Sequence, residues 1–423
     1  MIRTIKKIIG SKIVKNGVWL TILQIVNTIV PIITIPYITR ILGAEEYGVF
    51  SIALNWILYF QVFVEFGFGL NGSRKTALLG EKNKKGLNNL YNNIISSRII
   101  LALISFAILN IIALISGFSI KIYICMCFLF LMVIGTTFQL TWLFQGMQDM
   151  KFITIVNVVS RIISFSLIFL LVKTSKQLYL YCLLYSITLL VSSCISIIIA
   201  HRKYHLKFKF SSIKEIKKEI RDGKYLFASS AMIKIFGGFG TTILGIMSTN
   251  HITGVYSAIY KIPYILTLFF TPISQVIYPY ISSKMNNDFY KGLSVLKKIA
   301  FPIFLVFFIF SIIVIVFRNL IVDIMFGKEF IDYSIIIIPL VIQFLFAIIN
   351  NFIGIQTLVA SGNQKEYTNS LVIGCIAIVV LNILLCKLYD IYGISLAAMI
   401  SELILTISLY INYKKIIKFN QKK

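Results

Sequence analysis

Charge is scarce in this sequence: Lys, Arg, Asp and Glu together make up 13% of the 423 residues, and only 15 residues are acidic. Soluble domains carry about a quarter charged residues, so a chain that is 58% hydrophobic falls outside that class. The apolar residues form runs of about 20, the length that a helix needs to cross a hydrocarbon layer. The runs do not alternate with a period of two, which excludes a membrane barrel. The sequence therefore predicts an all-α membrane protein.

Several motifs of enzymes and metalloproteins are also missing. No Gly-rich phosphate loop of the GxxxxGK[ST] kind is present, so we expect no nucleotide hydrolysis. His201 and His205 have a spacing that can bind zinc, but no cysteine or carboxylate cluster joins them. We therefore expect no metal and no cofactor. All six cysteines lie in or at the edge of apolar runs, which favours packing over a disulfide framework: Cys125, Cys127, Cys182, Cys194, Cys375 and Cys386.

The apolar runs number twelve, so the chain is predicted to be a polytopic bundle of about twelve transmembrane helices. The predicted spans cover residues 16–39, 47–71, 93–116, 121–145, 153–173, 177–200, 224–249, 254–281, 298–317, 333–359, 368–388 and 391–412.

The basic residues predict the orientation of this bundle. The two termini and the loops on their side carry 30 Lys and Arg residues, whereas the opposite loops carry 7. Because basic loops stay in the cytoplasm, both termini are predicted to be cytoplasmic. The net charge of +26 then reflects topology and attraction to anionic phospholipids. It does not indicate nucleic acid, because the basic residues are spread over separate loops. Residues 1–15 mix Ile and Lys with amphipathic spacing and predict an interfacial helix.

The sequence also indicates an internal duplication. Residues 15–51 resemble residues 221–257 without a gap, so that Gly48-Val49-Phe50-Ser51 aligns with Gly254-Val255-Tyr256-Ser257 at an offset of 206. A second similarity, Gly146-Met147-Gln148 with Gly362-Asn363-Gln364, has an offset of 216. Six spans per copy start both copies on the same side. We therefore predict two parallel six-helix pseudo-repeats around a central cavity.

The predicted domains follow from this duplication. An N-terminal six-helix bundle with its amphipathic segment covers 1–200, a basic cytoplasmic linker covers 201–223, and a C-terminal bundle with a basic tail covers 224–423.

Ionisable residues inside the spans are the candidates for function, because each costs at least about 2.5–3.5 kcal/mol at the bilayer centre. Four are cations and two are anions, so at least two cations need water or an anionic ligand. Glu65 and Arg98 lie at similar depth in adjacent spans and can form an ion pair. Glu402 is either a partner of a cation or a protonatable coupling site. The full set is Glu65, Arg98, Arg161, Lys234, Lys261 and Glu402.

Prolines in the first and eighth spans remove backbone hydrogen bonds and can act as hinges. The hinge candidates are Pro31, Pro36, Pro263 and Pro272.

The chain resembles a known family along nearly its whole length. The stretch Arg40–Gly48 is similar to the signature after the first span of bacterial polysaccharide flippases, which export O-antigen and capsule repeat units. These belong to the multidrug/oligosaccharidyl-lipid/polysaccharide exporter superfamily. Further matching segments are Glu65–Phe68, Asn71–Arg74, Gly146–Arg161, Ile243–Gly245, Gly254–Pro279, Phe326–Glu329 and Tyr392–Glu402.

The resemblance implies a substrate and a location. The substrate would be an undecaprenyl-diphosphate-linked oligosaccharide, moved to the outer leaflet of the bacterial plasma membrane by alternating access. Arg161, Lys234 and Lys261 would contact the diphosphate or acidic sugars, with Arg98 at the inner mouth. Polysaccharide assembly proteins would be further partners.

Two alternatives remain at this point. An ion-coupled multidrug antiporter of the same superfamily would share the fold, but it should carry more intramembrane carboxylates. A membrane glycosyltransferase or polymerase would share the composition, but its chemistry needs a large external loop. The longest outer loop, 318–332, is short and amphipathic, so we expect no enzyme activity.

Overall fold

The computed structural model describes residues 12–421, which are helical almost throughout and contain no strand. The first eleven residues of the predicted amphipathic segment lie outside the described residues. Long apolar helices dominate the described part, as expected for a polytopic all-α membrane protein.

Ten helical segments between residues 12 and 421 are long and apolar enough to cross a membrane. Two of them are far longer than one crossing requires: Lys15–Leu79 has 65 residues and Gln364–Lys418 has 55. Each of these two segments contains two of the predicted spans. The ten segments are therefore compatible with twelve crossings.

Both long segments contain a sharp change of direction. In α2 (Lys12–Glu65) the helical geometry is interrupted at Gly43, whose φ of 72° lies in the left-handed region that favours glycine. In α16 (Gln364–Gln421) it is interrupted at Asp390, with φ 48° and ψ −126°. The backbone stays helical at Pro31 and Pro36. The turn in α2 is therefore at the glycine, while the hinge role of Pro31, Pro36, Pro263 and Pro272 stays a prediction.

The chain folds into two compact units. Unit 1 contains residues up to 34 and residues 52–234, and unit 2 contains residues 35–51 and 235 onwards. Helix α10 (Ile213–Met247) runs from unit 1 into unit 2, so the predicted start of the second bundle at residue 224 lies inside a helix. The units differ from the predicted halves because segment 35–51 packs with unit 2. The division into six-helix pseudo-repeats stays a prediction.

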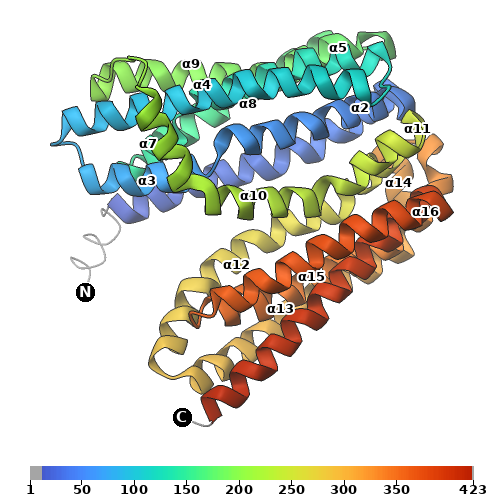
Figure 1. The fold of residues 1–423 in the computed structure, drawn as a ribbon. Coiled ribbons are helices and arrows are strands. Elements are labelled where there is room, and N and C mark those ends of the chain that lie inside the picture. Colours follow the sequence, from blue (N-terminus) through green and yellow to red (C-terminus); the bar gives the residue numbers. More distant parts are fainter. Residues whose placement is uncertain (1–11, 422–423) are drawn as a thin grey trace. The chain divides into compact units, whose positions relative to one another are not determined.

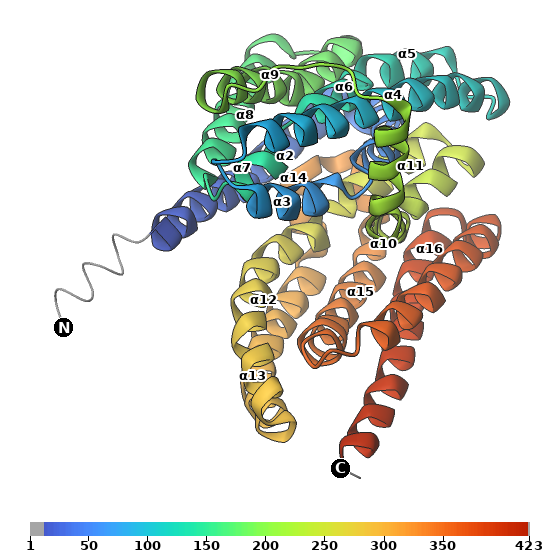
Figure 2. The same ribbon diagram turned by 60° about the vertical axis from the view of Figure 1, so that its left-hand side comes forward.

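Unit 1 is an array of long helices with one broken helix among them. Helices α8 and α9 lie side by side, and α6 packs against both α4 and α9 (Figures 1 and 2). Between α9 and α10 the chain is extended. The helices are α3 (Phe68–Leu79), α4 (Lys84–Ile115), α5 (Ile120–Leu129), α6 (Leu131–Phe138), α7 (Thr141–Gly146), α8 (Met150–Leu171) and α9 (Leu178–Tyr204), with a 3-10 turn at Ser175–Gln177.

The extended segment 206–212, here called the strap, falls within the predicted linker 201–223 and is fixed along α4. Every second backbone amide of the strap donates a hydrogen bond to a side chain of α4. The accepting side chains come from every fourth residue of α4 and therefore share one helix face. The amides of Lys207, Lys209 and Ser211 donate to Asn88 Oδ1, Asn92 Oδ1 and Ser96 Oγ at 2.8, 3.0 and 3.0 Å.

Unit 2 has the same all-helical character. Helices α12 and α13 lie side by side, and α15 lies beside α16 (Figure 2). Its core centres on edge-to-face contacts of Phe270 with Phe307 and Phe352. The elements are α11 (Asn250–Ile259), α12 (Lys261–Asn287), α13 (Phe289–Val316), α14 (Arg318–Phe326), a 3-10 segment η2 (Lys328–Ile336), α15 (Ile337–Asn350) and a π-helix η3 (Asn351–Val359), followed by α16.

Two glycines of the duplicated motif touch each other inside unit 2. A Cβ on Gly48 would lie 1.8 Å from the carbonyl oxygen of Asn250, and a Cβ on Gly254 would lie 1.9 Å from that of Ala44. Both residue pairs, Ala44 with Asn250 and Gly48 with Gly254, are separated by 206 positions. The contact is therefore self-complementary in the way of a two-fold interface. This geometry supports the duplication independently of sequence similarity.

Polar contacts hold segment 35–51 to the rest of unit 2. The guanidinium of Arg40 donates to the carbonyl oxygens of Asp323 and Ile324 at the C-terminal end of α14, where orphan carbonyls favour a cation. Glu329 accepts a hydrogen bond from the backbone amide of Ala44 at 3.2 Å. The segment that carries the motif Arg40–Gly48 is thus held by polar contacts at Arg40 and Ala44.

Candidate functional site

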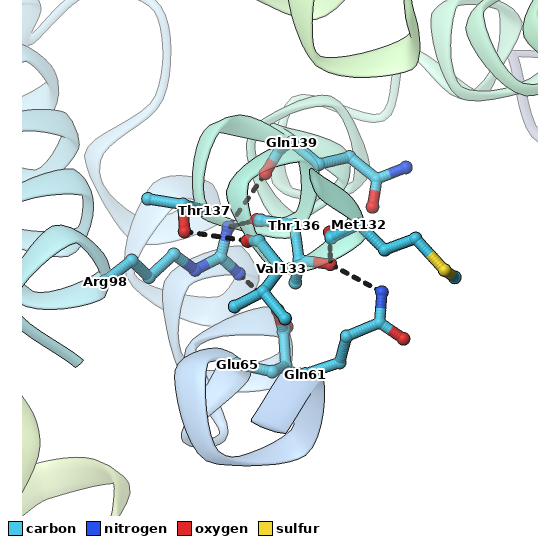
Figure 3. Close-up of polar contacts among 8 residues, drawn as sticks. All are labelled: Gln61, Glu65, Arg98, Met132, Val133, Thr136, Thr137 and Gln139. Carbon is cyan, nitrogen blue, oxygen red and sulfur yellow. Dashed lines mark hydrogen bonds and ion pairs between the residues drawn. The ribbon is translucent and has the colours of Figure 1, made fainter. Parts of the chain in front are cut away.

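Glu65 and Arg98 form an ion pair inside unit 1, with 2.5 Å between Arg98 Nη2 and Glu65 Oε2 (Figure 3). They come from α2 and α4. Arg98 is 2% exposed, whereas the side chain of Glu65 is 39% exposed. The pairing predicted for adjacent spans therefore forms, and it buries the cation more deeply than the anion.

Arg98 also binds the end of a broken helix. Its Nη1 donates to the carbonyl oxygens of Thr136 at 3.3 Å and Gln139 at 2.8 Å (Figure 3). Gln139 is extended, with ψ 129°, and it separates α6 from α7. Carbonyls at such an end have no helical partner and carry partial negative charge. The guanidinium therefore neutralises Glu65 and caps the interrupted span with the same side chain.

A polar pocket of about 240 Å³ adjoins this pair within unit 1. The buried indole nitrogen of Trp142 and the Nε of Arg98 have no hydrogen-bond partner among the described residues. The residues around the pocket thus include two buried donors without a partner and the partly exposed carboxylate of Glu65. Its walls are Glu65, Gly69, Arg98, Gln139, Thr141, Trp142 and Gln145.

Arg161 is a cation on the apolar helix α8 that has no partner among the described residues. The residue is half-buried, and within residues 12–421 no hydrogen bond or ion pair to its guanidinium is found. It differs in this from Arg98, whose charge is neutralised inside the protein. A guanidinium without a carboxylate in an apolar helix needs water or an anion.

Lys234 and Lys261 occupy two junctions of the chain. Lys234 is half-buried at the point where α10 passes from unit 1 into unit 2, and the residue takes part in a further interaction. Lys261 begins α12, directly after the short helix α11, and its ammonium lies 5.7 Å from the ring centroid of Tyr264. The described residues contain no ion pair between Lys261 and a carboxylate. Substrate contact at either lysine remains a prediction.

Glu402 is a buried carboxylate surrounded by amides in unit 2. It is 5% exposed, and Asn350 Nδ2 donates to its Oε1 at 2.7 Å. The amide of Gln343 lies beside the carboxylate. No Lys or Arg of the described chain pairs with Glu402. The sequence left open whether Glu402 neutralises a cation, and the structure provides amide donors instead.

The sequence interpretation missed the uncharged polar residues beside these charges. It considered only ionisable groups, although amides inside apolar runs are also costly to bury without partners. Gln139 and Gln145 were visible in the fourth predicted span, and the tenth span contains four amides: Gln343, Asn350, Asn351 and Gln356.

Residues 13–285 match the family described as polysaccharide biosynthesis protein. The chain belongs to this family. The match covers more than half of the sequence and includes the Glu65–Arg98 site, Arg161, Lys234 and Lys261. The resemblance to bacterial polysaccharide flippases is thereby confirmed.

Curated relatives in this family are similar over most of their length. A putative O-antigen transporter of Escherichia coli (strain K12) is 27% identical over 394 residues, which is 93% of this chain and 94% of the relative. A probable low-salt glycan biosynthesis flippase, Agl15 of Haloferax volcanii, is 25% identical over 403 residues, covering 93% and 82%. The capsular polysaccharide biosynthesis protein CapF of Staphylococcus aureus is 27% identical over 292 residues, covering 65% and 70%.

Solved structures of transporters share the fold of this family member. An inward-facing multidrug transporter of the MATE family has a TM-score of 0.71 at 14% identity, covering 94% of this chain and 99% of the transporter. The lipid II flippase MurJ, in an inward closed conformation, has a TM-score of 0.64 at 16% identity, covering 95% and 87%. These likenesses confirm the all-α, multi-pass transporter fold.

Proposed function

We propose that this chain is a flippase that carries a lipid-linked oligosaccharide from the cytoplasmic to the outer leaflet for surface polysaccharide synthesis. The family and the names of its relatives support the reaction class. The assignment of substrate-binding residues depends most on Arg161. This half-buried cation lies on an apolar helix and has no partner in the described chain. A substrate with an anionic headgroup supplies the missing charge.

The diphosphate of an undecaprenyl-diphosphate-linked glycan carries the negative charge that a cation such as Arg161 needs inside an apolar helix. A guanidinium binds a phosphate group through two parallel hydrogen bonds. Lys234 and Lys261 are each proposed to contact the diphosphate or acidic sugars of the substrate. The glycan then occupies a hydrated path while the polyprenyl chain remains in lipid.

Arg98 has a positioning role in this proposal. Its guanidinium already binds Glu65 and two carbonyl oxygens, so contact with a diphosphate would require breaking an ion pair that is 2% exposed on the cation side. The pair instead fixes the break between α6 and α7. The exposed part of Glu65 and the neighbouring glutamines then face the pocket of unit 1.

Alternating access supplies the movement. A substrate shifts the equilibrium between two conformations only through a difference in affinity for them. We assign the coupling of this equilibrium to Glu402, because a carboxylate with amide partners and no counter-cation is neutralised by binding a proton or a monovalent cation.

The proposed location is the bacterial plasma membrane with both termini in the cytoplasm. The strap supports a contact with anionic phospholipids on that side, because Phe208 and Phe210 are 49% and 52% exposed between exposed lysines. Exposed aromatic rings and basic residues together favour a lipid headgroup surface. Polysaccharide assembly proteins are the proposed protein partners, and the chain is proposed to have no enzyme activity of its own.

The proposal is tested by neutralising Arg161 and Lys234 one at a time. In a strain that lacks the native gene, R161Q and K234Q should abolish surface polysaccharide and cause lipid-linked repeat units to accumulate. The protein level in the membrane should stay unchanged. K151Q on α8 and K224Q on α10 are matched controls, since both lysines are exposed on the same helices, and they should support normal polysaccharide. Normal polysaccharide in both R161Q and K234Q would refute the assignment.

A further inference from the structure

Unit 2 contains a second cavity, and none of the candidate cations Arg98, Arg161, Lys234 and Lys261 lines it. The cavity, here called the unit 2 pocket, has a volume of about 420 Å³ and lies between α12, α15 and η3. This volume lies in the range of small-molecule sites, which combine apolar walls with a few polar groups. The described side chains that line the pocket include no charged residue.

Two side chains on α12 offer unused hydrogen-bonding groups to the unit 2 pocket. Gln275 and Tyr278 both line it, and neither side chain makes a hydrogen bond to another described residue. The amide of Gln275 provides donors and acceptors, and the hydroxyl of Tyr278 provides one donor and lone pairs. On the same helix the hydroxyl of Thr271 donates to the carbonyl of Thr267, which leaves its lone pairs free.

The π-helix η3 fixes the opposite wall. Gln356 Nε2 donates to the carbonyl and hydroxyl oxygens of Ser274 at 2.8 and 3.0 Å, and Ser274 Oγ donates to Asn351 Oδ1 at 2.8 Å. These bonds connect η3 to α12 through buried groups. Single turns of π-helix are frequent at functional sites. The pocket is therefore held in shape before any ligand arrives, which lowers the entropy lost on binding.

The chemistry of the lining narrows the class of ligand. A charged group would enter without a counter-ion, which is unfavourable away from water. A hydrocarbon chain would cover the free hydroxyl of half-buried Tyr278 without pairing it, at a cost of about 1–3 kcal/mol. It would also offer no hydrogen-bond partner to the exposed amide of Gln275 at the mouth of the pocket. A sugar ring presents hydroxyl groups at its edge and an apolar C–H face. The half-buried ring of Tyr278 can cover such a face.

We infer that the unit 2 pocket binds an uncharged glycosyl residue of the transported glycan, with Gln275 and Tyr278 as its hydrogen-bonding partners. The inference rests on the proposed flippase function and adds a sugar subsite separate from the cationic residues. It assigns specificity for the glycan to α12 and η3.

The test compares ligands that differ only in the sugar. Full-length protein in nanodiscs is titrated with farnesyl diphosphate and with farnesyl diphosphate carrying glucose, galactose or N-acetylglucosamine. The wild type should bind at least one glycosylated probe more tightly than farnesyl diphosphate. Q275L and Y278F should each lower the affinity for this probe about 3- to 10-fold, as expected for the loss of one hydrogen bond. Neither substitution should change the affinity for farnesyl diphosphate.

Two variants serve as controls. Tyr280 is 51% exposed on α12 and does not line the pocket, and Gln364 is exposed at the start of α16, so Y280F and Q364L should bind like the wild type. An equal loss of affinity for all probes in Q275L and Y278F would contradict the sugar subsite. It would instead assign the pocket to the lipid or the diphosphate of the substrate. Wild-type affinities in both variants, or no gain from any sugar, would also overturn the sugar subsite. Failure of the wild type to bind even farnesyl diphosphate would overturn the proposed function and the subsite with it.

Discussion

Individual charged residues in this protein fall into two kinds, which differ in how their charge is balanced. Arg98 is neutralised by Glu65 and by carbonyl oxygens at a helix end, whereas Arg161 has no partner in the described chain. Both are arginines inside apolar helices, and both cost free energy to bury. The balanced one stabilises a broken helix, and the unbalanced one is available to a ligand. Burial alone therefore does not identify a binding residue.

Glu402 is predicted to respond to ion gradients. E402Q keeps the size of the side chain but can neither release a proton nor balance a cation, so transport should lose its dependence on ion gradients. Flipping of a fluorescent lipid-linked glycan in proteoliposomes is measured before and after protonophore and sodium ionophore collapse the gradients. E366Q, on the same helix, should behave like the wild type. If collapse of the proton and sodium gradients leaves flipping by the wild type unchanged, Glu402 has no coupling role.

At the scale of elements, junctions between helices carry the polar contacts. Asn350 ends α15 and binds Glu402 on α16, and the next residue, Asn351, begins η3 and accepts from Ser274 on α12. Two consecutive amides therefore connect the buried carboxylate with the wall of the unit 2 pocket. Consecutive side chains of a helix point in different directions, which lets the two amides reach different partners.

The self-complementary glycine contact in unit 2 is predicted to be intolerant of any side chain. A Cβ at Gly48 would lie 1.8 Å from a backbone oxygen, and backbone cannot move aside as a flexible side chain can. G48A should lower stability by at least about 1–3 kcal/mol, the usual cost of overpacking. G254A should act similarly, because its clash with Ala44 has the same geometry. Thermal unfolding in detergent and the protein level in membranes are the measurements.

A glycine without neighbours provides the control for this contact. Gly237 lies inside α10, and a Cβ there would meet nothing within 4 Å. Because alanine favours a helix interior over glycine by up to about 1 kcal/mol, G237A should be neutral or stabilising. Wild-type stability of G48A together with G254A would show that the helices separate easily, contrary to the prediction.

At the scale of the whole molecule, orientation in the membrane is the property that the basic residues predict. In a cysteine-free variant, K328C should react with a membrane-impermeant maleimide in intact cells, because Lys328 is exposed in the loop predicted to lie outside. K207C, in the strap, should react only after the cells are permeabilised. The opposite pattern would reverse the predicted topology. Labelling of both sites in intact cells would place the strap on the outer side.

Most of the architecture was predictable because it depends on local sequence. Apolar runs of spanning length predict helices wherever they occur, since a bilayer leaves no other way to satisfy the backbone. The exceptions are the interruptions, such as Gly43 and Asp390. The backbone stays helical at Pro31 and Pro36, as it can when the surroundings of a proline compensate, and their role as hinges stays a prediction. A glycine with positive φ can end the helix without a side-chain clash.

The candidate site was predictable only in part, because partners far apart in sequence decide what a charge does. The sequence by itself determined the membrane class, the helices and the residues whose charge is costly in lipid, and it predicted the duplication at an offset of 206. Only the tertiary structure decided that Arg98 is neutralised, that Arg161 lacks a partner in the described chain, and that Glu402 meets amides. It also decided that segment 35–51 belongs to unit 2, where Gly48 meets Gly254. The physical reason is that hydropathy acts residue by residue along the chain, whereas pairing and close packing depend on which distant residues the fold brings together.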